Sequence, residues 1–490
     1  MKKILLSAAL LFALCVFGAD AQDKVTKKII EIGQTDNQTM AHEDFLANRI
    51  GGRPVGSHAL VDAENWVVEK LTEWGLEVKV QDVGQMAVSF NRGPWYGRFV
   101  GDGGFPLRFT TPVYSAGTKG PQKGHVVIEP KTKKQFDAIK GRLKGAWVLI
   151  EADTKGKAIL YDEKSNAERA KAIEEGDEAK LKEMTVPFYQ ELKAAGILGF
   201  IQSVDVPIFN RQNRNCWNVT MDNLPDLCDI LLDCDQYAVI RRKVERKEDF
   251  QLEFDIRNHF TRGPIKYRNV FGIIRGSKYP DEYVMSGAHL DSYDFASGAV
   301  DDGNGVSVLL ETARMLAKSG AKPLRTIIFC FWTGEEYGQL GSFHFVNNKT
   351  IPTEKISNYF NRDANTYVNS GLIVPPAMKD DFMKVCEPLF NLNPELPFEV
   401  KVREGGPQKR RGGGSDYSAF VLAGVPSIRF QETDPKGYGI PYSEVWHTDL
   451  DNYTKVIPEY LEHSATVQAV VMYGVANLNH LLSREDLYAD

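Results

Sequence analysis

Histidine and several carboxylates occur at short spacings in one stretch of the chain. Residues 287–305 read GAHLDSYDFASGAVDDGNG and hold His289, Asp291, Asp301 and Asp302. Carboxylates this close repel one another and lose hydration when they are buried, so a folded protein tolerates them only where a cation compensates. The stretch therefore predicts a bound cation.

Further acidic residues and a second histidine follow downstream. Glu335 and Glu336 lie in FWTGEEYG, Asp363 follows ISNYFNR, and His447 lies in VWHTDLDNY. Two histidines and several carboxylates around one point form the ligand set expected for zinc, and a carboxylate shared between two ions makes a two-metal site. We therefore expect a pair of zinc ions.

The segments around these residues alternate between strands and helices. A helix followed by a strand is expected over 56–83, with Gly75 as the helix stop. From residue 265 onward the expected elements are strands 269–276 and 282–289, helix 304–318, strand 324–332, helix 338–347, strand 355–360, helix 380–391, strand 398–402, helix 415–422, strand 426–430 and helix 455–482. This pattern predicts an α/β fold with a mostly parallel sheet flanked by helices. Because the carboxyl ends of parallel strands share one edge, the candidate ligands can converge there.

The middle of the chain breaks this alternation. Two strand-like runs, KGAWVLIEA and ELKAAGILGFIQSV, flank a highly charged segment over 163–184, which we interpret as a solvated helix. The two runs resemble a protease-associated domain, so a β-rich insert is expected over 108–261. The catalytic domain would then comprise residues 22–107 and 262–490.

The N-terminus has the pattern of a secretory signal peptide. MKKILLSAALLFALCVFGADAQ combines two lysines, a short apolar run and small residues at Ala19 and Ala21, which predicts cleavage after Ala21. The run is short for a membrane anchor, and bulky Leu14 before Cys15 disfavours a lipoprotein. The mature chain, 22–490, should therefore be exported, periplasmic or secreted, without stable membrane insertion.

Composition and cysteine content limit the remaining partners and cross-links. The net charge of −6 gives no electrostatic reason to expect nucleic acid, which favours a small or peptide substrate. Cys216, Cys228 and Cys234 are close enough in sequence to form one disulfide, whereas Cys330 is typical of a buried strand residue.

An ordered set of motifs connects the chain with a known family. The segments GAHLDSYDFASGAVDDGNGVSVLLETARML, RTIIFCFWTGEEYGQLGS, GGGSDYSAFVLAGVPSIRF and WHTDLDNY resemble the zinc aminopeptidases of clan MH, which include bacterial leucyl aminopeptidase and plasma glutamate carboxypeptidase. The resemblance covers roughly 265–460. It implies a phosphorylase/hydrolase-like zinc exopeptidase fold and an enzyme that is a zinc-dependent aminopeptidase or dipeptidase.

The resemblance also implies a role for each candidate residue. One zinc would be bound by His289 and Asp363, the other by Glu336 and His447, with Asp301 bridging both. Asp291 would accept a hydrogen bond from the second ring nitrogen of His289 and fix its tautomer. Glu335 would be the general base. The peptide bond between Asp301 and Asp302 would be cis.

Substrate-binding residues are implied less directly. Asp416 and Tyr417 are near the site by analogy, although Ser-Asp before an apolar run also forms an ordinary helix N-cap, and Asp302 has the same capping alternative. Some relatives have a Tyr before the last His, where this chain has Trp446. Tyr442 or the Trp446 indole is therefore the candidate oxyanion donor.

Three functions are compatible with the motifs. The first is a two-zinc peptidase, the second a one-zinc glutaminyl cyclase, and the third a non-catalytic binding module of the same fold. Retention of every ligand and of Glu335 argues against the binding module. A protease-associated insert together with HLDS and TGEEYG is commoner among peptidases than among cyclases, so the peptidase is favoured. The crowded carboxylates should attract a free α-amine, whereas a substrate carboxylate would need a cation. The loop over 401–416 offers Arg403, Lys409, Arg410 and Arg411 for that purpose.

Overall fold

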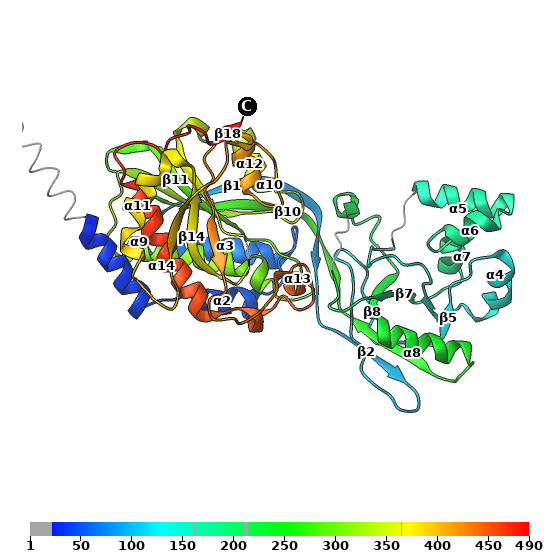
Figure 1. Ribbon diagram of the computed structural model, residues 1–490. Coiled ribbons are helices and arrows are strands. Elements are labelled where there is room, and N and C mark those ends of the chain that lie inside the picture. The colour runs from blue at the N-terminus through cyan, green and yellow to red at the C-terminus, as the bar shows by residue number, and fades with distance from the viewer. Residues whose placement is uncertain (1–21, 160–162, 210–213, 364, 490) are drawn as a thin grey trace, which may run out of the picture.

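The computed structural model describes residues 22–159, 163–209, 214–363 and 365–489. The chain forms two lobes joined by long strands (Figure 1). The predicted signal peptide, residues 1–21, lies outside the described residues. In the described part of the chain, no helix has the length and hydropathy needed to cross a membrane.

The larger lobe is built on a five-stranded sheet in the order β1-β10-β12-β11-β13. These strands are β1 (Glu77–Asn91), β10 (His259–Ile274), β12 (Arg325–Trp332), β11 (Tyr279–His289) and β13 (Ile356–Asn361). Strand β12 is buried along its whole length because its side chains alternate between two apolar clusters. Phe329 and Phe331 pack on one face of the sheet, and Cys330 and Trp332 on the other.

Helices cover both faces of this sheet. One face is covered by α3 (His58–Glu73), α9 (Asn304–Lys318) and α14 (Pro458–Ala476), the other by α10 (Leu340–Asn347) and α12 (Tyr417–Leu422). Ser57 caps the N-terminus of α3, because its side chain accepts the Leu60 N–H, and the chain turns away after the helix at Gly75, whose φ is 80°. The predicted α/β class is confirmed.

The sheet is mixed, which corrects the prediction of a mostly parallel one. Strands β11, β12 and β13 are parallel, whereas β10 runs antiparallel to β12 and β1 antiparallel to β10. The turn over 275–278 is too short for a crossover and reverses the chain between β10 and β11. Helices α9 and α10 supply the crossovers that keep β11, β12 and β13 parallel.

Several predicted elements of the larger lobe have different bounds, and one strand longer than two residues was missed. The 455–482 helix is α14, which starts at Pro458, and the 380–391 helix is α11 (Lys379–Cys386) continued by a short 3₁₀ turn. The strand predicted over 426–430 is mostly irregular, and β17 (Phe430–Thr433) begins at its end. It pairs with β14 (Val368–Val374), the missed strand, which also pairs with β15 (Glu399–Val402). Further short elements of the larger lobe are α2 (Thr39–Asp44), α13 (Tyr442–Val445), β16 (Gln408–Lys409) and β18 (Tyr488–Ala489).

The smaller lobe, here called the second unit, comprises the strands and helices between Trp95 and Ile256. Its strands form two sheets, in the orders β2-β9-β4 and β3-β8-β7-β6-β5. They are β2 (Trp95–Val100), β3 (Phe109–Thr110), β4 (Gln122–Gly124), β5 (Val126–Ile128), β6 (Trp147–Leu149), β7 (Gly199–Val204), β8 (Cys228–Asp233) and β9 (Gln251–Ile256). Its helices are α4 (Lys133–Ile139), α5 (Glu163–Glu175), α6 (Glu178–Glu183), α7 (Tyr189–Ala194) and α8 (Cys234–Glu245).

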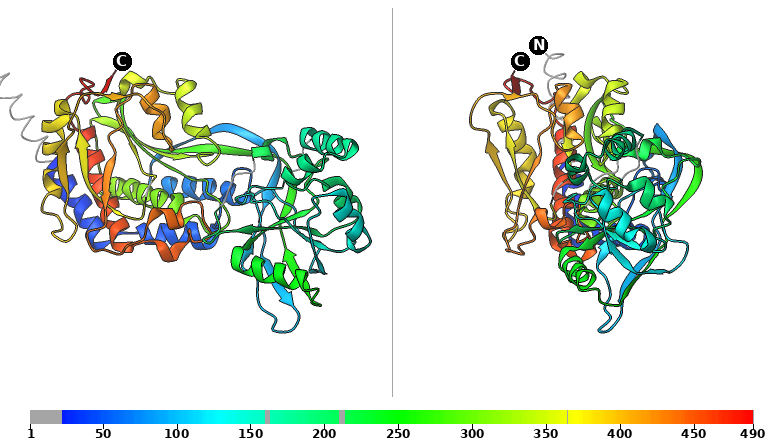
Figure 2. Two further views of the ribbon diagram at one scale, coloured as in Figure 1. Left: turned by 45° about the vertical axis from the view of Figure 1, so that its right-hand side comes forward. Right: turned by 90° about the vertical axis from the view of Figure 1, so that its right-hand side faces the viewer.

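The second unit has apolar clusters of its own. Trp147 and Phe254 belong to one and Phe188 and Phe200 to another. The charged segment over 163–184 is two helices, α5 and α6, separated at Gly176, whose φ is 66°. Long strands β1 and β10 run from the central sheet toward this unit (Figures 1 and 2).

The cysteines of the described chain are all free. Cys216, Cys228 and Cys330 are buried, and Cys234 is half-buried. The disulfide considered among Cys216, Cys228 and Cys234 is not formed. The structure places them apart: Cys216 packs in the core of the larger lobe, and Cys228 in a cluster of the second unit. Proximity in sequence did not bring these thiols together in the fold.

Candidate metal centre

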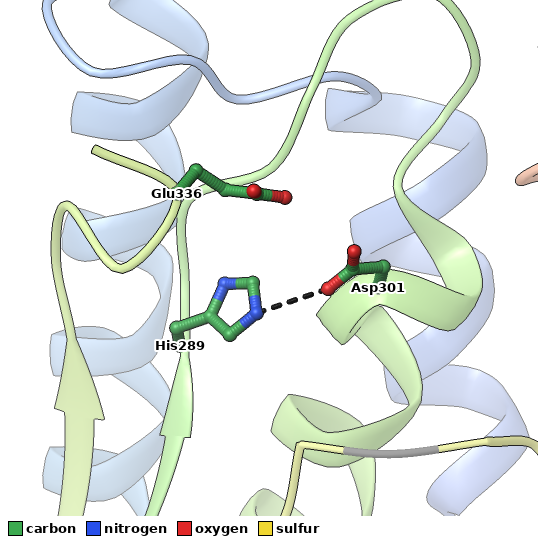
Figure 3. Close-up of side chains that lie close together, drawn as sticks. All are labelled: His289, Asp301 and Glu336. Atoms are coloured by element: carbon green, nitrogen blue, oxygen red, sulfur yellow. Dashed lines mark hydrogen bonds and ion pairs between the residues drawn. The ribbon is translucent and has the colours of Figure 1, made fainter. Parts of the chain in front are cut away.

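The predicted ligands lie at the carboxyl ends of the three parallel strands and on two nearby loops. His289 is the last residue of β11, Glu336 follows β12, and Asp363 follows β13. Asp301 lies in the turn before α9, and His447 follows α13. Figure 3 shows His289, Asp301 and Glu336 pointing toward one another.

Asp301 lies between the two histidines, with one oxygen toward each. His289 Nε2 is 3.1 Å from Asp301 Oδ1, and His447 Nε2 is 3.2 Å from Asp301 Oδ2. Asp363 Oδ2 is 3.9 Å from His289 Nε2, and Glu336 Oε2 is 2.9 Å from His447 Nε2. The five residues therefore form two neighbouring groups that share the Asp301 carboxylate.

Two oxygens in this cluster fit a cation better than a hydrogen bond. Asp301 Oδ2 and Glu336 Oε1 are buried and accept no hydrogen bond. Ligand atoms of His289, Asp301 and Glu336 lie within 4.8 Å of one another, and so do those of His289, Asp302 and Asp363. Buried carboxylate oxygens that accept no hydrogen bond are stabilised by a positive charge nearby, so the residues present fit a divalent metal.

The electrostatics of the protein alone show the same excess of negative charge. Burial disfavours the imidazolium of His447, but Glu336 and Asp301 outweigh burial and raise the pKa of His447 to about 10. Burial raises the pKa of Glu336 to about 7, and the charge of Asp301 adds to the effect. Without a metal, the raised pKa values of His447 and Glu336 favour their protonated forms, which offset part of the negative charge that a bound cation would otherwise balance.

The orientation of His289 differs in one detail from the prediction. Its Nδ1 donates to the backbone carbonyl of Asp291 at 2.9 Å, while the Asp291 carboxylate is 3.8 Å away. That carboxylate instead accepts the N–H groups of Glu335 and Glu336, at 3.1 and 3.2 Å. Asp291 therefore fixes the His289 ring through its main chain and the Glu335–Glu336 turn through its side chain.

Glu335 lines the pocket beside the cluster. One of its oxygens accepts a hydrogen bond from Gln339 Nε2 at 3.2 Å. Burial raises the pKa of Glu335 well above its usual value, against the effect of His289, and the Asp363 and Asp416 carboxylates raise it further. A carboxylate held in this way is a strong proton acceptor when it is ionised.

Three residues hold the turn that carries Asp301. Asp302 accepts the N–H groups of His289 and Gly305, at 3.1 and 3.2 Å, so it caps the start of α9 as the capping alternative proposed. Asp451 accepts the Val300 N–H at 2.6 Å and the Asp301 N–H at 3.3 Å. Buried Arg53 donates to the carbonyls of Leu290, Ser297 and Gly298. The Asp301–Asp302 peptide bond is cis, as the resemblance implied.

A pocket of about 310 Å³ opens onto the cluster. Its wall is formed by Asp301, Glu335, Asp363, Gly414, Ser415, Tyr417, Arg429, Tyr442, Trp446 and His447. Tyr417, Tyr442 and Trp446, the candidate substrate-binding residues, thus belong to the pocket wall. Asp416 is buried behind the wall, its side chain makes no N-cap hydrogen bond, and burial raises its pKa to about 7.

The pocket wall contains an arginine, Arg429, which the sequence did not single out. Its guanidinium carbon lies 4.3 Å from the centre of the Tyr417 ring. The basic residues predicted from the 401–416 loop do not line the pocket. Arg403 donates to the carbonyls of Asp486 and Leu487, and Arg410 packs over Tyr488. Those contacts tie the loop to the C-terminal segment.

Solved structures share this fold along most of the chain. A peptidase M28 precursor from Shewanella amazonensis superposes with a TM-score of 0.58 at 21% identity, covering 95% of this chain and 98% of that one. A zinc aminopeptidase from Bacillus subtilis gives a TM-score of 0.50 at 18% identity, covering 92% and 97%. The fold is that of the M28 peptidases.

Sequence comparison matches part of the chain to a known peptidase family. Residues 269–472 match the model of peptidase family M28. Human carboxypeptidase Q is 30% identical over 221 residues, which are 44% of this chain and 43% of that protein, so this alignment spans less than half of the human protein. Mouse carboxypeptidase Q is 24% identical over 94% of this chain and 91% of its own length. Residues 269–472 therefore form a peptidase M28 domain.

Proposed function

We propose that the chain is an exported two-zinc exopeptidase that hydrolyses the N-terminal bond of peptides or dipeptides. The observation that carries this proposal is the Asp301 carboxylate, which faces His289 with one oxygen and His447 with the other. His289 and Asp363 would hold one zinc, Glu336 and His447 the second, and Asp301 would contact both. When bound, zinc supplies Lewis acidity that lowers the pKa of water and polarises a carbonyl.

The chain's own groups would supply the rest of the chemistry. Glu335 lies in the pocket wall beside Asp301 and Asp363 and would take the proton of the attacking water, then pass it to the leaving amine. Asp291 holds the Glu335 backbone, which keeps the base beside the ligand Glu336. Tyr442 lines the pocket, and burial raises its pKa well above its usual value, so it remains a neutral donor for the substrate oxygen.

The domain assignments are proposed together with this function. The second unit would be the protease-associated-like insert. Its strand β2 lies before the expected boundary of 108, and β3 begins just after that boundary, at Phe109. Cleavage after Ala21 would release the mature chain.

A glutaminyl cyclase of this fold would use one zinc, so the shared Asp301 favours the peptidase.

The substrate's two ends are expected to be recognised by opposite charges. Asp301, Asp363 and Glu335 offer carboxylates to a free α-amine, while Arg429 offers a guanidinium to a carboxylate. We therefore expect the protein to cleave a free dipeptide and to lose most of that activity when the dipeptide is N-acetylated. Undiminished cleavage of the acetylated form would contradict recognition of the amine.

A variant of Arg429 tests recognition of the other end. Arg429→Gln should lower kcat/KM for a free dipeptide by about 10- to 100-fold, since it removes a charge-assisted hydrogen bond. The dipeptide amide should be cleaved equally by both proteins. Arg410→Gln, which changes a basic residue outside the pocket wall, is the matched control. If Arg429→Gln cleaves the free dipeptide as fast as wild type, Arg429 does not bind the carboxylate.

A further inference from the structure

The second unit contacts the loop that carries His447. Phe209 and Thr448 form an antiparallel backbone bridge. Next to it, the Asp449 N–H donates to the Ile208 carbonyl at 3.1 Å, and the Ile208 N–H donates to Asp449 Oδ1 at 2.7 Å. The main chains of the two lobes are therefore hydrogen-bonded within two residues of His447.

A charged contact reinforces this pairing. The Arg108 guanidinium of the second unit donates to Asp449 Oδ2 from Nη2 at 2.7 Å and from Nε at 3.1 Å. Both carboxylate oxygens of Asp449 are thus occupied by groups of the second unit. Hydrogen bonds between two charged groups are stronger than neutral ones and fix the geometry as well.

Apolar side chains complete the contact. Buried Ile208 packs with Val204 and Leu231 of the second unit and with Phe295. Phe295 lies on the loop between Asp291 and Asp301, so the same patch touches both loops of the candidate metal centre. Docking of the second unit therefore bears on the positions of Asp301 and His447 together.

The imidazole of His447 is surrounded by aromatic rings, one of them from the second unit. Phe209 lies 5.8 Å from His447 and 5.6 Å from Trp446, centre to centre. Trp446 stacks on His447 at 4.1 Å, and Tyr293 meets it edge-on at 4.6 Å. His447 also has a left-handed backbone, with φ 57°, which a non-glycine residue keeps only where its surroundings impose it.

We propose that the second unit positions the metal ligand His447. Asp449 and Arg108 are positioning residues that hold the 446–449 loop, and Phe209 keeps the imidazole directed at Asp301 and Glu336. This inference rests on the proposed function, because it takes His447 as a zinc ligand. It gives the second unit a role in assembling the metal centre.

The test compares zinc affinities in the full-length mature protein. The variants are Phe209→Ala, Phe209→Leu, Arg108→Met, Arg108→Lys and Asp449→Asn, and His447→Ala identifies which zinc is lost. The matched control is Arg98→Met, because Arg98 pairs with Glu253 at 2.9 Å on the same unit and is 48% exposed, compared with 41% for Arg108. Each protein is titrated with a zinc chelator, and kcat and KM are measured separately.

Phe209→Ala and Arg108→Met should each lower the affinity for one zinc, the one that His447→Ala loses, by about 10- to 100-fold. Changes to groups that orient metal ligands typically have this effect. The other zinc should keep its affinity. Phe209→Leu and Arg108→Lys should recover part of the lost zinc affinity. Asp449→Asn keeps an oxygen that can accept the Ile208 N–H, so its loss of zinc affinity should be smaller than the summed losses of Arg108→Met and Phe209→Ala. kcat should fall more than KM rises.

Two results would overturn the inference. One is that Phe209→Ala and Arg108→Met bind both zincs as wild type and Arg98→Met do. The other is an equal loss of both zincs together with a lower melting temperature, which would indicate general destabilisation. A wild-type protein without zinc or peptidase activity would instead refute the proposed function, so the two failures are distinguishable.

Discussion

Glu335→Gln is expected to lower turnover by about 10²- to 10⁴-fold while zinc stays bound. The substitution keeps the size of the side chain and its contact with Gln339, but removes the proton acceptor. Asp291 would still hold the backbone of this turn. Steady-state kinetics on a dipeptide and metal analysis of the same sample check the result.

Glu336→Gln is the matched comparison, because it makes the same change one residue further along. Glu336 Oε2 lies 2.9 Å from His447 Nε2, so this variant should lose the zinc shared with His447. Loss of zinc in Glu335→Gln, with zinc retained in Glu336→Gln, would mean that base and ligand are exchanged between the two residues.

Asp301→Asn is expected to have the broadest effect on the metal centre. The variant replaces a charged bridge by a neutral amide, so both zincs should bind more weakly and turnover should fall by about 10³-fold or more. Removal of zinc from the wild type with a chelator should abolish activity in the same way, and added zinc should restore it. Chelator titration and kinetics measure both effects.

Asp229→Asn is the control for burial. Asp229 is buried in the second unit, where it accepts hydrogen bonds from the Ile159 N–H and from Gln202. This variant should keep both zincs even if its melting temperature falls. Unchanged zinc binding in Asp301→Asn would refute the bridging role.

The clustering of the candidate ligands could be predicted from the sequence because three of them follow or end strands. His289, Glu336 and Asp363 each follow or end an apolar strand-like run, and parallel strands bring such ends to one edge. The order of motifs, by resemblance, then assigned Asp301 and His447 to the same centre. The structure brings all five together.

Groups that depend on tertiary contacts could not be predicted in this way. Arg429 reaches the pocket from irregular chain before β17, and Asp451 reaches the Asp301 backbone from another loop. Arg53 holds the 290–298 loop from far away in the sequence. No local pattern marks these contacts, because each depends on where two distant loops meet. The direction of β10 was missed for a similar reason, since strand patterns carry no orientation.

The most direct test of the two-zinc centre is the metal content of the active, mature protein. Inductively coupled plasma mass spectrometry on purified protein, with activity measured as zinc is added back to the chelated form, gives the stoichiometry. The shared Asp301 carboxylate predicts about two zincs per chain, with full activity only when both are bound. A single tightly held zinc in fully active protein would contradict the account.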